Sequence, residues 1–223
     1  GEWYLNNATG ILYFWPDGDV ATTEMAISTF PTDLILVYEG SNIKFDKLTV
    51  EMSRRAPIKI TNGVNIEISN SIIRNAGTEV IMVLGTGNKV TKCKIYNASN
   101  YGVRVDGGTR SSLTMAGNVI QNNEIHDNGL WQPTVTEAVS ISGVGQIFIK
   151  NDVYNADGTA MMVRGNNHLI QYNNIHDVAN YVNDMGAIYV GGGWDQRGDV
   201  IRFNYIHNIN SEIYISSITQ YLI

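Results

Sequence analysis

The sequence predicts an all-β protein, a right-handed parallel β-helix in which the chain winds through stacked rungs of roughly two dozen residues. The first reason is a short motif that recurs along the chain. The second is the alternation of apolar and polar residues at period two, which is typical of strands. The third is a composition with only 16% charged residues and 22 glycines, which favours a β-solenoid over a helical protein.

The recurring motif is five residues long and reads Asn-x-Ile-His-Asp or Asn. Clear copies start at Asn123, Asn173 and Asn204, and weaker copies start at positions 71, 93 and 151. The starts are separated by 22, 30, 28, 22 and 31 residues, so a 22-residue rung explains them if three rungs carry insertions of 6 to 9 residues. An antiparallel sandwich, the competing all-β fold, would not require corresponding residues to recur in the same order.

Two columns of this motif are predicted to face the interior. The third position is always aliphatic, and the first position shares its strand parity but holds Ser, Cys or Asn. A buried Asn needs partners for its amide, and a ladder of amides from successive rungs supplies them. Cys93, the only cysteine, is predicted to be a small buried filler of this ladder, and it leaves no intramolecular disulfide. The aliphatic column consists of Ile73, Ile95, Ile125, Val153, Ile175 and Ile206.

A second strand follows in each rung and usually ends at a glycine. Examples are residues 80–85, 138–143, 160–165 and 187–192. Glycine suits a sharp corner because it has no Cβ atom. The sequence therefore predicts a strand and a corner at the same place in each rung.

We divide the chain into an N-terminal lead-in segment, residues 1–40, and a β-helix of about seven rungs, residues 41–223. Residues 3–5 and 11–15 predict an aromatic hairpin that packs near one end of the β-helix as a lead-in or cap. At the other end, residues 212–215 begin another strand without a polar cap. We therefore expect a truncated C-terminal end and self-association through the exposed end rung.

The net charge of −6 argues against nucleic acid or an anionic membrane as a partner, and it favours a neutral ligand such as a glycan. The longest strongly apolar run, residues 34–38, is too short to span a bilayer. No cofactor is expected from the motifs.

Six motifs carry a family resemblance: G-E-W-Y-L at 1–5, L-Y-F-W-P at 12–16, S-I-S-G-V-G at 140–145, G-N-N-H-L-I-Q-Y-N at 165–173, D-M-G-A-I-Y at 184–189 and R-G-D-V-I-R-F-N-Y-I-H at 197–207. Through them the chain resembles bacterial β-helix proteins of carbohydrate-degrading loci, in particular glycoside hydrolase family 141 with its fucosidase and xylanase members. The resemblance implies a secreted or periplasmic bacterial glycosidase that acts on a polysaccharide or oligosaccharide.

The chain departs from this group at three places. Residues 157–158 are Asp-Gly where the group has Pro-His, and residues 191–194 are Gly-Gly-Gly-Trp where it has Gly-Arg-Asp-Trp. Residues 214–217 read Tyr-Ile-Ser-Ser where the group has Tyr-Leu-Asp-Asp, so a carboxylate is missing. A non-catalytic carbohydrate-binding or structural β-solenoid is therefore an alternative to an enzyme.

Three carboxylates form the predicted catalytic group: Asp184, which also matches the family motif, Asp157 and Glu137. They lie seven, eight and six residues before the glycines used to align the rungs, which are Gly191, Gly165 and Gly143. Neighbouring rungs stand about 4.8 Å apart, so this alignment permits carboxylate separations of about 5 or about 10 Å and thus a retaining or an inverting glycosidase. Turn capping and a calcium site are the alternatives for the same residues.

Substrate-binding residues are expected on the outward face of the second strand and on the inserted loops. Arginine on this face can hold a uronate carboxylate, and exposed tryptophan can stack on a sugar ring. The strand candidates are Arg104, Asp106, Arg164 and Tyr189, and the loop candidates are Trp131, Trp194 and Arg197.

The leading hypothesis is a polysaccharide-active glycoside hydrolase, or a fragment of one. A polysaccharide lyase or uronate epimerase is the alternative enzyme, with Arg164 or Tyr189 as its base. His126, His176 and His207 fall in one outward column and are predicted to stack at the surface, because a zinc site needs convergent ligands.

Overall fold

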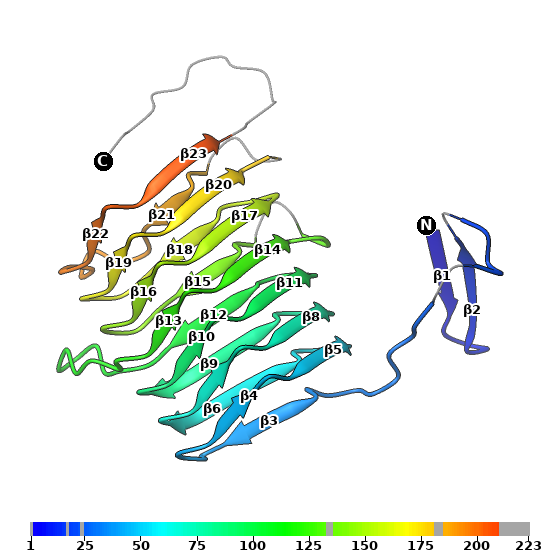
Figure 1. Ribbon diagram of the computed structural model, residues 1–223, viewed down its shortest axis with the longest axis horizontal. Helices are drawn as coiled ribbons and strands as arrows, with labels where there is room; N and C mark the ends of the chain where they lie inside the picture. The colour runs from blue at the N-terminus through cyan, green and yellow to red at the C-terminus, as the bar shows by residue number, and fades with distance from the viewer. Residues whose placement is uncertain (1, 17, 23–24, 133–135, 181–184, 210–223) are drawn as a thin grey trace.

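A computed structural model describes residues 2–16, 18–22, 25–132, 136–180 and 185–209 (Figure 1). Every regular element in these ranges is a β-strand. Beyond an N-terminal hairpin, the strands form three parallel sheets of seven strands each. Neighbours in each sheet are the corresponding strands of successive rungs, which confirms the predicted parallel β-helix.

Each rung contributes one strand to each sheet. The first sheet contains β3 (Ile35–Tyr38), β6 (Ile58–Val64), β9 (Ile81–Thr86), β12 (Val103–Asp106), β15 (Val139–Ile141), β18 (Met161–Val163) and β21 (Ile188–Val190). The second contains β4 (Lys44–Asp46), β7 (Glu67–Ser69), β10 (Lys89–Thr91), β13 (Val119–Gln121), β16 (Ile147–Ile149), β19 (Leu169–Gln171) and β22 (Val200–Arg202). The third contains β5 (Thr49–Ser53), β8 (Ile72–Ala76), β11 (Lys94–Ala98), β14 (Glu124–Asn128), β17 (Asp152–Ala156), β20 (Asn174–Val178) and β23 (Tyr205–Ile209).

The predicted aliphatic column forms the core behind the third sheet. Its first five members are fully buried, at 0% exposure, and each pairs in register with its counterpart on the next rung. Ile206 is 43% exposed because β23 is the outermost strand of its sheet. Each rung therefore buries its apolar face against its neighbours, as a solenoid requires.

The predicted amide ladder lies at the corner between the second and third sheets. Asn123 donates its side-chain amide to Oδ1 of Asn151 at 3.0 Å, and Asn151 donates to Oδ1 of Asn173 at 3.2 Å. The same oxygens accept backbone N–H groups, such as that of Cys93 on Oδ1 of Asn123 at 2.9 Å. The ladder thus satisfies both the side chains and the inward backbone groups of the corner.

A second ladder, which the sequence did not predict, lies at the corner between the first and second sheets. Asn88 donates to Oδ1 of Asn118 at 3.0 Å, and Asn118 donates to Oε1 of Gln146 at 2.9 Å. The backbone N–H of Gln146 then donates to Nδ1 of His168 at 3.1 Å. Because the residue type changes along this ladder, no recurring letter marks it in the sequence.

Backbone conformation explains the Asn or Asp at the fifth position of the motif. Asn97, Asp127, Asn155 and Asp177 have φ angles between 49° and 56°, a left-handed region that Asn and Asp tolerate better than other side chains. At the corner between the first and second sheets, glycines stack directly on one another. A Cβ atom on Gly165 would lie 2.0 Å from the carbonyl oxygen of Gly143, so no side chain fits there.

The predicted aromatic hairpin is present. Strand β1 (Glu2–Asn6) pairs antiparallel with β2 (Ile11–Trp15), and Asn6 lies opposite Ile11. The hairpin contacts the β-helix through stacked rings of Trp3 and Trp131, with centroids 6.0 Å apart. Trp131 follows β14 in the middle of the stack, so the hairpin lies beside the β-helix (Figure 1). The sequence predicted instead that the hairpin packs near one end.

The two ends of the β-helix differ from the predicted boundaries. Strand β3 already belongs to the first sheet, so the β-helix begins at Ile35 and not at residue 41. The strand predicted at residues 212–215 lies outside the described residues, and self-association through the end rung stays a prediction. Within the described ranges, no helical segment has the length and apolarity needed to cross a membrane.

Replacing Asn151 by Ala should lower the free energy of unfolding by about 3 kcal/mol, because the amide and backbone N–H of Asn123 and the carbonyl of Ile120 lose buried partners. Chemical denaturation followed by circular dichroism measures this loss. Asn174→Ala is the matched control, because Asn174 is only half-buried and bonds to Asp152 at the surface. Equal effects of the two substitutions would show that the ladder does not stabilise the fold.

Candidate functional site

The outward face of the first sheet, from β12 to β21, carries several of the predicted binding residues. Strand register places Arg104 opposite Ser140, Ser140 opposite Met162, and Met162 opposite Tyr189. Rungs stand about 4.8 Å apart, so these side chains form one row parallel to the helix axis.

Glu137 stands beside this face as a nearly buried carboxylate. Its side chain is 7% exposed, and Nη1 of Arg164 lies 3.7 Å from its Oε1. The Arg164 side chain remains 49% exposed. A buried carboxylate is tolerated when a positive charge compensates for its lost hydration, and Arg164 supplies that charge. The pair therefore joins a sheltered carboxylate to an accessible guanidinium.

Tyr101 shares this environment, although the sequence did not single it out. Val103 lies opposite Val139, so Tyr101 and Glu137, each two residues earlier, lie on adjacent rungs. Burial raises the pKa of Tyr101 and the charge of Glu137 raises it further, whereas Arg104 and Arg164 lower it. We call Tyr101, Arg104, Glu137 and Arg164 the Glu137 cluster. The equal offset of Tyr101 and Glu137 from their strands was the signal that could have revealed it.

His168 holds the backbone beside Arg164. It is 1% exposed, and its Nε2 lies 3.0 Å from the carbonyl oxygen of Arg164 while its Nδ1 accepts the N–H of Gln146 at 3.1 Å. Both contacts are satisfied when Nε2 carries the proton and the ring is neutral. Burial accordingly lowers the pKa of His168, despite the opposing effects of the Arg164 carbonyl and of Asp199 and Asp106. A neutral His168 therefore fixes the position of Arg164 at the end of β18.

The strand register corrects the alignment of the three predicted carboxylates. Val163 lies opposite Val190, so Gly192 and not Gly191 corresponds to Gly165. Val139 lies opposite Met161, so Glu137 corresponds to Thr159 and is offset by two residues from Asp157. Gly143 therefore corresponds to Gly165, and the two carboxylates keep the two-residue offset that follows from their spacings of six and eight residues before these glycines.

Asp157 lies half-buried in the turn after β17. Burial raises its pKa, and the negative charge of Asp127 raises it further. Asp184, the principal carboxylate of the sequence prediction, lies outside the described residues. The proposed role of these two carboxylates thus stays a prediction.

The family model described as a right handed beta helix region matches residues 9–135. The chain belongs to the right-handed β-helix family. No curated protein matches it.

Among solved structures, this right-handed β-helix is similar to the crystal structure of pectate lyase Pel9A, with 13% sequence identity and a TM-score of 0.46. The match covers 78% of this chain and 48% of that one, so the chain spans about half the length of the lyase. The likeness concerns the fold, and the chemistry of the β-helix must be argued from its own residues.

The remaining predicted binding residues occupy other places on the β-helix. Trp194 and Arg197, between β21 and β22, line a pocket of about 320 Å³ at the corner of the first and second sheets. Asp106 is half-buried at the end of β12, and Trp131 stacks on Trp3 of the hairpin. The sequence did not predict the other five residues of the corner pocket, which are Arg110, Leu113, Asn166, Asp195 and Gln196.

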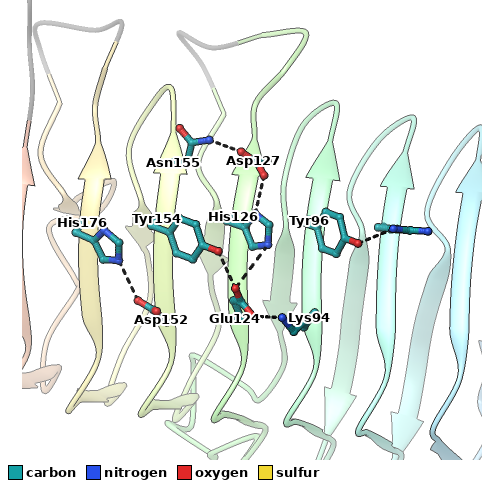
Figure 2. Close-up of polar contacts among 10 residues, drawn as sticks. Lys94, Tyr96, Glu124, His126, Asp127, Asp152, Tyr154, Asn155 and His176 are labelled. Carbon is teal, nitrogen blue, oxygen red and sulfur yellow. Dashed lines mark hydrogen bonds and ion pairs between the residues drawn. The ribbon is translucent and has the colours of Figure 1, made fainter. Parts of the chain in front are cut away.

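A ladder of aromatic rings runs along the third sheet of the β-helix (Figure 2). Tyr96, His126, Tyr154, His176 and His207 stack in this order, with successive centroids 4.8, 4.7, 5.1 and 4.9 Å apart. The rings are within 10° of parallel. The predicted surface stacking of the histidines is confirmed.

Carboxylates bind the edges of these rings (Figure 2). Nδ1 of His126 lies 2.6 Å from Asp127, and the hydroxyl of Tyr154 donates to Glu124 at 2.7 Å. Each inner ring face is covered by the next ring, so these inner faces are closed to a sugar. Among the described residues, no group of three or more His, Cys, Asp or Glu side chains could hold a metal ion. We interpret the ladder as a stabilising feature of the surface.

The neutral state of His168 predicts a pH-dependent stability. Because the pKa of His168 is lower in the folded chain than its ordinary value of 6.5, the unfolded chain binds more protons below that pH. The free energy of unfolding should therefore decrease as the pH is lowered from about 7.5 to about 5, and His168 should contribute on the order of 1 kcal/mol of this decrease. Denaturation of wild type and His168→Gln at both pH values measures this share. An identical fall in the two proteins would contradict the assignment.

Proposed function

We propose that the outward face of the first sheet binds an acidic polysaccharide and that the Glu137 cluster cleaves it by β-elimination. The observation that carries the proposal is a nearly buried carboxylate beside a half-exposed arginine, with a phenol on the adjacent rung. A β-helix can present such a set along a chain that lies across its rungs.

Local charge supports an acidic substrate in spite of the net charge of −6. Arg104 and Arg164 both lie close enough to Tyr101 to affect its titration, and both are exposed. Guanidinium groups bind carboxylates through paired hydrogen bonds. The two arginines would therefore hold and neutralise the carboxylate of a uronate unit.

Elimination needs a base, a neutralised carboxylate and an acid, and the cluster contains all three. Glu137 takes the proton from the carbon next to the substrate carboxylate, and the electrons of that C–H bond form a double bond with the neighbouring carbon. The glycosidic C–O bond on that neighbour breaks, and the leaving oxygen takes a proton from the phenol of Tyr101. A raised pKa keeps this phenol protonated, as a proton donor must be. Solvent then restores both groups, and no water is added to the products.

The arginine and tyrosine bases of the sequence hypothesis are assigned differently here. An arginine side chain stays protonated in proteins, so Arg164 binds the substrate instead of removing its proton. Tyr189 is exposed in the row that begins with Arg104, where it can contact the sugar. Arg104 and Arg164 also supply the positive charge that calcium would otherwise provide, so we expect turnover to persist in excess chelator.

Glycoside hydrolysis is the second candidate, and the resemblance to glycoside hydrolase family 141 favours it. Its specific support is the raised pKa of Asp157, because a general acid must be protonated near neutral pH. A two-residue offset across one rung corresponds to about 8 Å, which lies in the range of inverting enzymes. In that reaction Asp157 and Glu137, with Asp184, would act on a water molecule and the leaving oxygen.

Glu137→Gln should lower the rate of cleavage of uronate polysaccharides about 100-fold or more, because it removes the base. The assay incubates the protein with neutral and uronate polysaccharides and follows the ultraviolet absorbance and the mass of the products. Glu51→Gln is the matched control, because Glu51 forms an ion pair with Arg74 on the third sheet.

The products separate the hypotheses. Unsaturated products that Glu137→Gln abolishes support elimination. Products heavier by one water that Asp157→Asn abolishes would replace it by hydrolysis, and binding without any turnover would leave a carbohydrate-binding protein.

A further inference from the structure

The corner pocket differs in composition from the Glu137 cluster. It opens between two loops, residues 107–118 and residues 191–199, and has a volume of about 320 Å³. Small-molecule sites span about 300–1,000 Å³, so the pocket suits one sugar unit of a longer chain. Its polar and aromatic lining consists of Arg110, Asn166, Trp194, Asp195, Gln196 and Arg197.

A buried amide builds this pocket. Asn166 is 2% exposed, its Oδ1 accepts Nε of Arg110 at 3.1 Å, and its Nδ2 donates to the carbonyl of Asp195 at 2.9 Å. Nη2 of Arg110 also lies 2.9 Å from Oδ1 of Asp195. The guanidinium is therefore held by two partners, and within the described residues its Nη1 has none. A fixed guanidinium with free N–H groups is a ready site for an anion.

Trp194 provides the second feature, because its side chain is 100% exposed. An indole in full contact with water contributes nothing to the core, so its packing does not explain it. The neighbouring Gly193 lies close to the Asp195 carboxylate, since a Cβ atom on it would be 2.5 Å from Oδ1 of Asp195. The loop thus places Trp194 in the lining of the same pocket as Arg110 and Arg197.

We infer that the corner pocket binds one anionic sugar unit, a uronate or a sulfated sugar. The apolar face of the pyranose ring would stack on Trp194, and Arg110 and Arg197 would bind the anionic group. Asp195 would accept a hydrogen bond from a sugar hydroxyl. Carboxylate and sulfate share this chemistry, and a neutral sugar lacks it.

The pocket loop lies next to Arg164 of the proposed cleavage site. Gln196 donates from Nε2 to the carbonyl of Val163 at 3.2 Å, one residue before Arg164. A Cβ atom on Gly192 would lie 3.5 Å from the side chain of Arg164. One polysaccharide chain can therefore contact Arg164 and fill the pocket with a neighbouring unit. This placement of one chain rests on the proposed function, whereas the anion site itself does not.

The test measures binding in the Glu137→Gln protein, so that the ligand stays intact. The probes are short oligouronates, sulfated oligosaccharides and neutral oligosaccharides of equal length, titrated by calorimetry. Trp194→Ala and Arg110→Gln should each weaken binding of the anionic probes about tenfold. Added salt should weaken binding in the parent more than in Arg110→Gln.

Two matched controls should bind like the parent. Arg202→Gln removes an arginine whose Nε also donates to a side-chain amide, that of Gln171, but on the second sheet. Trp15→Ala removes an exposed tryptophan of the hairpin. Because Trp194 contributes no buried surface, thermal denaturation should show that Trp194→Ala folds normally.

The outcomes separate this inference from the proposed function. Equal binding by Trp194→Ala, Arg110→Gln and the parent would overturn the anion site even if Glu137-dependent cleavage is found. Tighter binding of neutral than of anionic probes would also overturn it. Weakened anion binding in both variants supports the site, whether or not any polysaccharide is cleaved.

Discussion

Buried amides that satisfy one another across rungs are the constraint on which the rest of this structure depends. A corner turns backbone N–H and C=O groups away from the strands that would otherwise pair them, and burial makes unpaired groups costly. The side chain of Asn151 offsets this cost through three hydrogen bonds, to Asn123, Asn173 and the carbonyl of Ile120. Because each amide fits only one neighbour above and below, the ladders also fix the register, and with it the order of the outward side chains.

Features in which the same residue type recurs on successive rungs could be predicted from the sequence. Features built from different residue types on successive rungs could not. The aliphatic column, the Asn ladder and the histidine stack repeat at intervals set by the rung, so the chain reveals them. The second ladder changes from Asn118 to Gln146 to His168 and so leaves no repeat. A run of three glycines hid the corner at Gly192, so the sequence alignment of Asp184 was displaced by one residue. The pairing of Glu137 with Arg164 joins different rungs and needed the register itself.

Net charge does not describe the local charge of each face, because charges on a solenoid are distributed by sheet. On the second and third sheets, several basic residues pair with acids one rung away, as Lys44 does with Glu67 and Lys94 with Glu124. Such exposed pairs contribute little stability but cancel locally. On the first sheet, Arg164 pairs with Glu137 but stays half-exposed, and Arg104 is exposed. A chain of net charge −6 can therefore still present a basic face.

Insertions decide where such a face becomes a pocket. A rung without an insertion turns the corner between the first and second sheets in a few residues, as in the segments 142–146 and 164–168. The longer loops, 107–118 and 191–199, come from rungs on either side of these two short ones. They meet over the short rungs, where Arg110 reaches both Asn166 and Asp195. A solenoid of uniform rungs would offer a flat row of side chains at this corner. The pocket is concave because the two loops that form its walls are longer than the two short segments between them.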